Sequence, residues 1–291
     1  MKSWLIYLKE RFPLPVYFLL SGGLAASGSV LVGRPIMTIP TMYAFGYAMW
    51  LFATLRLMDE LKDYDKDVIA HPTRPLPRGV LKVGVVEKVI HGSMIAGVAL
   101  SFGFFVFDKM AAILALITTA WLWLMYKEFY LGEKLSKRPI LYAITHQIIL
   151  IPFCLALSAA PIEDGNVNYF VFWWSIGVLG SFFTYEVSRK LDPKAHAVLG
   201  TYLSVYGKAG CMAIVIALFM LCFFSGINVM LPFWTIPWAV LTVLSYGLLW
   251  TQNTDKPGKM HKVIEGFATL SLFFFIWSPA LFNFYAKLVE L

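Results

Sequence analysis

The sequence is organised by long apolar runs that recur over its whole length. Hydrophobic residues make up 59% of the 291 residues, and the mean hydropathy is +0.71, whereas a soluble domain has about 45–50% apolar residues. A helix needs about 20 apolar residues to cross a bilayer. The sequence therefore predicts an all-α integral membrane protein with nine transmembrane helices, at residues 13–32, 39–58, 83–106, 110–130, 139–160, 168–188, 209–228, 232–252 and 264–285.

The runs leave only short loops, so we expect a single transmembrane helical domain over residues 1–291. The net charge of +7 does not indicate a nucleic-acid partner, because the basic residues are not gathered on a soluble module. Most of them fall in alternate loops, which follows the positive-inside rule if the N-terminus is cytoplasmic. We therefore expect an integral cell-membrane protein, in contact with the lipid bilayer, whose N-terminus and charged loops are cytoplasmic. The three cysteines lie in apolar runs and have no disulfide or metal spacing.

Charge concentrates in residues 56–79, R-L-M-D-E-L-K-D-Y-D-K-D-V-I-A-H-P-T-R-P-L-P-R-G, which we call the charged stretch. On one helix Asp59, Asp63 and Asp67 would follow one another by one turn and line one ridge. Because like charges at that spacing repel, the arrangement needs a cation. Mg²⁺ is the natural candidate, since it is held by one or two carboxylates and completes its shell with phosphate oxygens. The alternative is a solvated acidic helix end followed by a basic cytoplasmic loop.

Arginines follow and precede these acids. Arg74 and Arg78 stand among three prolines that stiffen the loop, and they could meet phosphate groups in charge-assisted contacts. Arg56, one turn before Asp59, is either a structural partner of the acids or a phosphate ligand.

The charged stretch resembles the first aspartate-rich motif of the UbiA superfamily of intramembrane prenyltransferases, N-D-x-x-D-x-x-x-D followed by R-P-x-P-x-G. Asp59 stands where the family has Asn, Glu60 stands at its first Asp, and Asp63 and Asp67 stand at the next two. The resemblance implies a UbiA-type helical bundle, a prenyl diphosphate substrate, and Mg²⁺ bound by these four acids, with Asp59 and Asp63 also catalytic.

Residues 182–192, F-F-T-Y-E-V-S-R-K-L-D, repeat this design at the end of a later span, and we call them the second motif. The family has a second D-x-x-x-D here, whereas this chain keeps Glu186 and has Arg189 and Lys190 in the other places. We expect Glu186 to be catalytic and a metal ligand, and the two cations to be catalytic residues that neutralise the diphosphate directly. The alternative is that the basic residues only mark the cytoplasmic helix end.

Five further residues are candidates for the wall of a substrate cavity. Tyr126, with Lys127 as a diphosphate ligand, partly matches a Tyr and a basic pair of the family, although an interfacial aromatic belt explains them equally. His146 and Gln147 lie deep in an apolar run, where they either face the cavity or bond another helix. Tyr185 and Asn253 complete the set, and Asn253 also fits a wet helix terminus.

These residues predict a Mg²⁺-dependent membrane enzyme that ionises a prenyl diphosphate and releases pyrophosphate. Aromatic side chains, 16% of the chain, could shelter the allylic carbocation. The resemblance links acceptor activation to the second aspartate motif, so its loss favours intramolecular cyclisation, as in terpene cyclases (synthases) of the superfamily. The alternative is transfer to an aromatic or lipid acceptor. A transporter or pore is a third class, which the clustering of acids at one face disfavours.

Overall fold

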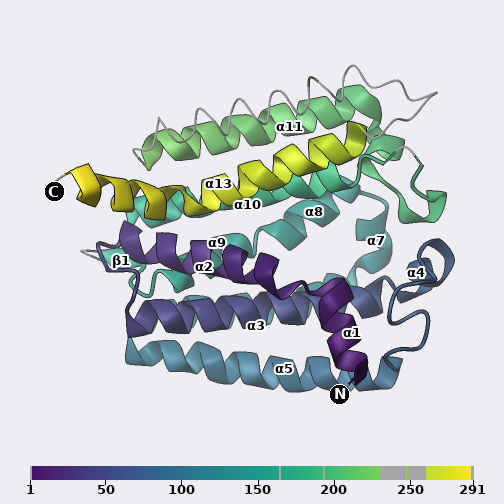
Figure 1. Ribbon diagram of the computed structural model, residues 1–291, viewed down its shortest axis with the longest axis horizontal. Helices are drawn as coiled ribbons and strands as arrows, with labels where there is room; N and C mark the ends of the chain where they lie inside the picture. Colours follow the sequence, from purple (N-terminus) through teal and green to yellow (C-terminus); the bar gives the residue numbers. More distant parts are fainter. Residues whose placement is uncertain (1, 164, 193, 230–246, 248–259, 290–291) are drawn as a thin grey trace. The chain divides into compact units, whose positions relative to one another are not determined.

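The computed structural model describes residues 2–163, 165–192, 194–229, 247 and 260–289 (Figure 1). Within these ranges the chain is almost entirely helical. The α-helices are α1 (Lys2–Arg11), α2 (Leu14–Leu31), α3 (Ile39–Lys62), α4 (Tyr64–Ala70), α5 (Val83–Gly103), α6 (Lys109–Tyr126), α7 (Gly132–Ser136), α8 (Pro139–Gln147), α9 (Leu150–Leu157), α10 (Tyr169–Arg189), α11 (Tyr202–Asn228) and α13 (Met260–Val289). Short 3-10 helices η1 (Phe104–Val106), η2 (Glu128–Tyr130) and η3 (Ala197–Leu199) and a two-stranded hairpin, β1 (Ile162–Glu163) and β2 (Asn166–Val167), connect them.

Seven helical segments of the described chain are long and apolar enough to cross a membrane: α2, α5 with η1, α6, α8 with α9, α10, α11 and α13. α3 has 24 residues, which at about 1.5 Å per residue is also sufficient length, but its last two turns are charged. An all-α membrane protein is thus confirmed. The span predicted at 232–252 lies outside the described residues except for Gly247, so the number nine stays a prediction.

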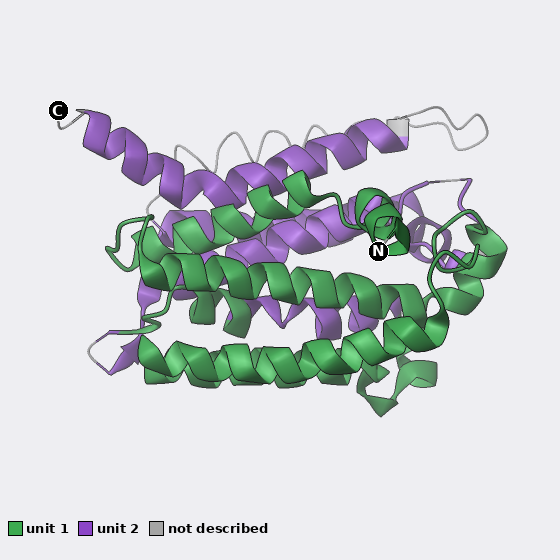
Figure 2. Ribbon diagram, turned by 60° about the horizontal axis from the view of Figure 1, so that its bottom comes forward, with its two compact units in different colours: residues 1–138, 152–162 green, residues 139–151, 163–291 purple. Residues whose placement is uncertain are grey.

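The helices form two compact units (Figure 2). Unit 1 comprises residues 1–138 and 152–162, and unit 2 comprises residues 139–151 and 163–291. The single domain expected over residues 1–291 stays a prediction, and each unit is described by itself.

Unit 1 is built around α3, which packs against α2 and α5 while α5 packs against α6. Small residues allow this close approach. A Cβ atom on Gly97 of α5 would lie 2.0 Å from the ring of Trp50, whose indole Nε1 donates to the carbonyl oxygen of Ser93 at 2.9 Å. Tyr47, fully buried, donates from its hydroxyl to the carbonyl oxygen of Ala115 at 2.9 Å. These hydrogen bonds fix the position of α3 along α5 and α6, and therefore the place where its charged end begins.

Unit 2 is built around α10, which packs against both α11 and α13. Gly177 on α10 again has no room for a side chain, because a Cβ atom there would lie 2.1 Å from the ring of Phe275. Near the other end of α10, Val187 and Leu191 are buried with Tyr202 and Cys211 of α11 in one apolar cluster. Because Val187 and Leu191 belong to the second motif, this cluster fixes the backbone of that motif.

Five predicted spans differ in detail from the helices. The helix α3 continues to Lys62, beyond the predicted residue 58, and α13 covers Met260–Val289, beyond the predicted bounds 264–285. The span 139–160 is divided into α8 and α9, because Pro152 has no amide hydrogen for Ile148 and its ring crowds that carbonyl group. The helix α11 is kinked at Gly207, which has a non-helical φ of +64°, so a short helical segment from Tyr202 precedes the predicted span 209–228. The span predicted to residue 130 ends at Tyr126, because the next residues turn with positive φ.

Candidate functional site

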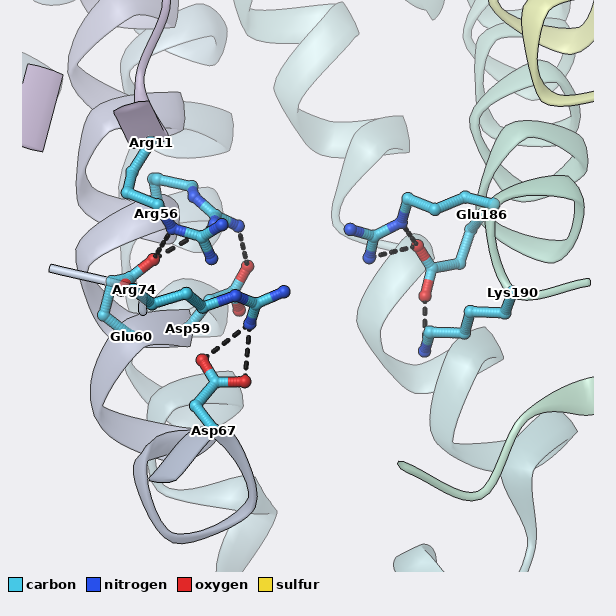
Figure 3. A network of polar contacts seen from close by, with 9 residues as sticks. Arg11, Arg56, Asp59, Glu60, Asp67, Arg74, Glu186 and Lys190 are labelled. Carbon is cyan, nitrogen blue, oxygen red and sulfur yellow. Dashed lines mark hydrogen bonds and ion pairs between the residues drawn. The ribbon is translucent and has the colours of Figure 1, made fainter. Parts of the chain in front are cut away.

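Glu60 is the most deeply buried acid of the charged stretch, with 1% of its side chain exposed. Its Oε1 accepts from Arg11 Nε at 2.6 Å and from an Arg56 terminal nitrogen at 3.0 Å (Figure 3). Arg56 also lies 4.0 Å from Asp59, so two guanidinium groups face one buried and one half-exposed carboxylate. Burial and the neighbouring Arg56 lower the pKa of Arg11. Ionised groups buried away from water need partners of opposite charge, because their burial is costly. The two arginines are these partners for Glu60.

Asp67 is the second buried acid, with 3% of its side chain exposed. Arg74 donates from one terminal nitrogen to both of its carboxylate oxygens, at 2.5 and 2.6 Å (Figure 3). The pair closes the turn between α4 and the loop that follows. Burial and the nearby Arg74 also lower the pKa of His71, at the end of α4. Asp67 is therefore held by a base in the same loop.

The three aspartates do not share one ridge, which corrects the prediction. The helix is interrupted at Asp63, where φ is −91° and ψ is 3°, although the amide of Asp67 still donates to the carbonyl oxygen of Asp63 at 2.8 Å. Beyond this point Asp67 is buried, whereas Asp63 is exposed and the side chain of Asp59 is 49% exposed. Asp59 lies 4.0 Å from Arg56. Two acids are thus enclosed and two remain open to solvent.

Arg78 lies in the proline-rich loop between α4 and α5. Its terminal nitrogens donate to Glu10 Oε1 at 2.7 Å and to the carbonyl oxygen of Thr73 at 3.0 Å. Gly79 follows with φ +78°, a conformation that glycine adopts without steric cost. This turn returns the chain to α5 with Leu76 buried beneath it.

Lys62 and Glu128 form a pair that the sequence reading did not identify. Their charged atoms are 3.8 Å apart, and 12% of the lysine side chain is exposed. Glu128 belongs to η2, in which Glu128, Phe129 and Tyr130 all have positive φ, between 49° and 56°. The pair joins the end of α3 to the turn after α6.

The two predicted residues before this turn lie against each other. The Lys127 ammonium is 4.7 Å from the ring centroid of Tyr126 and 5.0 Å from that of Trp123. Such cation–π contacts stabilise the charge at a partly exposed site. Lys127 is therefore a cation held at the end of α6, and no described contact places it on the charged stretch.

The second motif forms a cluster of its own in unit 2. Arg189 donates to Glu186 Oε2 from Nε at 3.1 Å and from a terminal nitrogen at 2.8 Å, and Lys190 contacts Oε1 at 2.6 Å (Figure 3). The lysine also lies 5.5 Å from the ring centroid of Tyr202. Both oxygens of the single acid are thus occupied by bases, and 43% of the arginine side chain stays exposed.

The remaining cavity candidates are not gathered by a described contact. His146 stacks on Tyr142 with ring centroids 4.0 Å apart. The Nδ1 atom of His146 lies 2.8 Å from the carbonyl oxygen of Tyr142. These contacts lie within α8 rather than between helices. Gln147 ends α8, Tyr185 is partly buried on α10, and Asn253 lies outside the described residues.

The donor set fits Mg²⁺ only in a restricted form. Among the described residues no three acids, histidines or cysteines lie close enough to hold a metal ion together. Glu60, Asp67 and Glu186 are each paired with bases, and the four predicted ligands of the charged stretch do not come together around one point. Asp59, which also lies 4.0 Å from Arg56, and Asp63 are open to solvent at one helix end, which suits a Mg²⁺ that takes one or two carboxylates and shares the phosphate oxygens of a substrate.

The arginines keep hydrogen-bonding capacity for an anion. A guanidinium group has five N–H donors, and the described contacts of Arg74 and Arg78 use only their terminal nitrogens. Arg56 Nε is buried without a hydrogen-bond partner among the described residues. This end of unit 1 can therefore bind phosphate oxygens without breaking all of its ion pairs.

Sequence reasoning missed Glu10, Arg11, Lys62 and Glu128. Each contacts the charged stretch or belongs to it, but the partners lie far apart in sequence. One signal was present: Glu10 and Arg11 end a short N-terminal segment rich in charge.

No family model matches the sequence, and no curated protein matches it significantly. Two solved structures are similar over nearly their whole length. A UbiA homologue from Aeropyrum pernix K1 has a TM-score of 0.65 at 14% identity, covering 92% of this chain and 98% of that chain. A digeranylgeranylglyceryl phosphate synthase studied in membranes has a TM-score of 0.61 at 18% identity, covering 96% and 99%. The chain therefore has the fold of these two proteins, one of them a UbiA homologue, which is the fold that the charged stretch predicted.

Proposed function

We propose that this protein is a membrane enzyme that binds a prenyl diphosphate and cleaves its carbon–oxygen bond. The observation that carries the proposal is the end of α3 and the loop after α4, where Arg56, Arg74 and Arg78 accompany the two open acids Asp59 and Asp63. Anions with several oxygens suit guanidinium forks. The similarity in fold to a UbiA homologue supports the same class of protein. Because fold alone does not establish function, the assignment rests on the site.

The arginines would bind the diphosphate and orient it for departure. Each guanidinium group offers N–H donors in a planar fork, and positive charge placed where negative charge develops lowers the barrier. Mg²⁺ bound by Asp59 and Asp63 would offset the negative charge of the diphosphate when present. Arg56, Arg74 and Arg78 would offset the rest of this negative charge, since they are already charged and are held in place by their acids. Lys127 in unit 1, and Arg189 and Lys190 in unit 2, stay further candidates for diphosphate ligands.

Cleavage leaves both electrons of the carbon–oxygen bond on the diphosphate and an allylic carbocation on the prenyl chain. Cyclisation follows when a double bond of the same chain attacks this carbon and the new carbocation loses a proton to water or to the released pyrophosphate, giving a cyclic hydrocarbon. Capture by water would give an alcohol instead. Glu186 favours cyclisation, because both of its oxygens are occupied by Arg189 and Lys190. It is therefore not free to take a proton from an acceptor.

Transfer to an acceptor is the second candidate, and the similarity to a digeranylgeranylglyceryl phosphate synthase favours it. In that case a nucleophilic oxygen or ring carbon of a lipid or aromatic acceptor attacks the carbocation and loses a proton. The same diphosphate contacts would serve both outcomes.

The deciding experiment incubates the purified protein in detergent with Mg²⁺ and C10, C15 or C20 prenyl diphosphate, and measures pyrophosphate together with organic products. Pyrophosphate with a cyclic product and no acceptor supports cyclisation. Turnover that begins only when an aromatic or lipid acceptor is added supports transfer. If no prenyl diphosphate yields pyrophosphate under either condition, the proposal fails. A flux assay in proteoliposomes would then test the transporter reading.

A further inference from the structure

α1 ends in two neighbouring residues of opposite charge, and each binds a different part of the charged stretch. Arg11 donates to Glu60, near the end of α3, at 2.6 Å. Glu10 accepts from Arg78, in the loop after α4, at 2.7 Å. The partners come from opposite ends of the charged stretch, so α1 joins two segments that are distant in sequence.

The contact with Glu60 is a shared one. Arg11 and Arg56 donate to the same oxygen of Glu60, and the three side chains are 17%, 16% and 1% exposed. Arg56 also lies 4.0 Å from the half-exposed Asp59, so two bases face two acids at this place. The position of Arg56 therefore depends on an acid that Arg11 also holds.

Unused hydrogen-bonding atoms gather at the same junction. Arg56 Nε, Glu60 Oε2 and the Tyr7 hydroxyl are buried and have no hydrogen-bond partner among the described residues. Tyr7 belongs to α1, and burial together with the negative charge of Glu60 raises its pKa. Buried polar atoms are usually satisfied by protein, water or ligand. This junction of α1 and α3 thus retains capacity for a polar ligand or an ordered water.

We propose that α1 is part of the diphosphate site, where Arg11 positions Arg56 through Glu60 and Glu10 positions Arg78. The inference rests on the proposed function and adds the N-terminal helix to it. Arg11 and Glu10 are positioning residues, since each acts through another side chain. Without Arg11, the cluster of Arg56, Glu60 and Asp59 would hold one base and two acids, and its net negative charge would oppose the binding of a diphosphate.

Arg11→Gln tests the first contact, with Lys9→Gln as the matched control, because Lys9 is exposed on the same helix and is in no ion pair that the described chain shows. We expect Arg11→Gln to raise the KM for prenyl diphosphate about tenfold, the size of one charge-assisted contact, with kcat within about twofold of wild type. Arg11→Lys should restore most of the affinity, since its ammonium keeps the charge and can reach Glu60. Lys9→Gln should leave KM unchanged.

Glu10→Gln tests the second contact. We expect about a threefold rise in KM, smaller than for Arg11→Gln because Arg78 keeps its bond to Thr73. A fall in KM would mean that Glu10 competes with the substrate for Arg78, which would overturn its positioning role.

The role of Arg11 is overturned if Arg11→Gln has the KM of Lys9→Gln. It is also overturned if Arg11→Gln lowers the unfolding temperature and kcat and Arg11→Lys does not restore KM. Titration calorimetry with inorganic pyrophosphate separates this inference from the proposed function. If the wild type binds pyrophosphate but turns over no prenyl diphosphate, the enzyme proposal fails, and the affinities of the same variants for pyrophosphate still decide whether α1 belongs to the site.

Discussion

A single nitrogen of Arg74 lies between both carboxylate oxygens of Asp67, at 2.5 and 2.6 Å. The acid is almost fully buried while 27% of the arginine side chain is exposed. The pair therefore closes the loop over α4 and still presents the rest of the guanidinium group outward. The contact stabilises the loop and, in the proposed function, also orients Arg74 for the diphosphate.

Asp67→Asn should destabilise the protein, because Arg74 would keep its positive charge while its buried partner would lose the negative charge. Breaking a buried ion pair costs about 3 kcal/mol. Asp65→Asn is the matched control, since Asp65 is exposed two residues away, and it should change stability by less than about 0.5 kcal/mol. Denaturant unfolding of the detergent-solubilised variants measures the difference. Equal stability of the two variants would contradict a structural role for the pair.

Asp63→Asn should abolish pyrophosphate release, with a fall of at least about 100-fold in kcat/KM. The reason is that Asp63 is exposed and therefore available to the substrate or its metal. Unfolding should stay within about 0.5 kcal/mol of wild type, as expected for a surface change. Release at the wild-type rate would contradict both cyclisation and transfer, whereas normal activity of Asp65→Asn is required of the control.

Chelation should stop turnover if the two open acids take Mg²⁺ with the substrate. EDTA is expected to abolish pyrophosphate release, and added Mg²⁺ to restore it. Calorimetry provides the structural readout: without substrate, Mg²⁺ should bind weakly, because no described group of three ligands exists to hold it. Tight binding of Mg²⁺ to the free protein would contradict this account of the site.

Arg189→Met should raise the KM for prenyl diphosphate several-fold, because the variant removes a guanidinium group that is 43% exposed and held by Glu186. Lys194→Met is the control in the loop after α10, where the lysine is exposed. The comparison is steady-state kinetics of both variants. If both raise KM equally, a general loss of positive charge explains the effect and the specific role of Arg189 is rejected.

Gly97→Ala should destabilise unit 1 by about 1–3 kcal/mol, the usual cost of overpacking. The added methyl group would meet the Trp50 ring and disturb the bond from its indole to Ser93. Gly92→Ala on the same helix has open space around it and should be neutral or stabilising by up to about 1 kcal/mol. Thermal unfolding of both variants tests the pair, and equal behaviour would contradict the packing.

The helices could be predicted from sequence because their cause is local. About 20 apolar residues suffice to specify a span, and α2, α5 and α10 begin and end within one or two residues of the predicted bounds, apart from the short η1 that continues α5. The division of the span 139–160 into two helices follows from the missing amide hydrogen of Pro152, but it was not predicted.

The charged sites were predicted less completely, because spacing specifies which residues are near each other on one helix and not which partner lies across the fold. The pattern identified Glu60 and Asp67 as acids of one site, yet burial and the arginine partners separate them from Asp59 and Asp63. Arg11 reaches Glu60 from 49 residues away in sequence, which no local pattern contains.

The turn after α6 has a consequence for protein engineering. Glu128, Phe129 and Tyr130 are three successive left-handed residues with side chains, and each such residue costs roughly 1–2 kcal/mol. Glycine would remove that cost but would also remove the Glu128 carboxylate from Lys62 and the Phe129 ring from Trp121. A more heat-resistant version of this protein is therefore best sought at Tyr130, whose exposed ring leaves the most freedom to change.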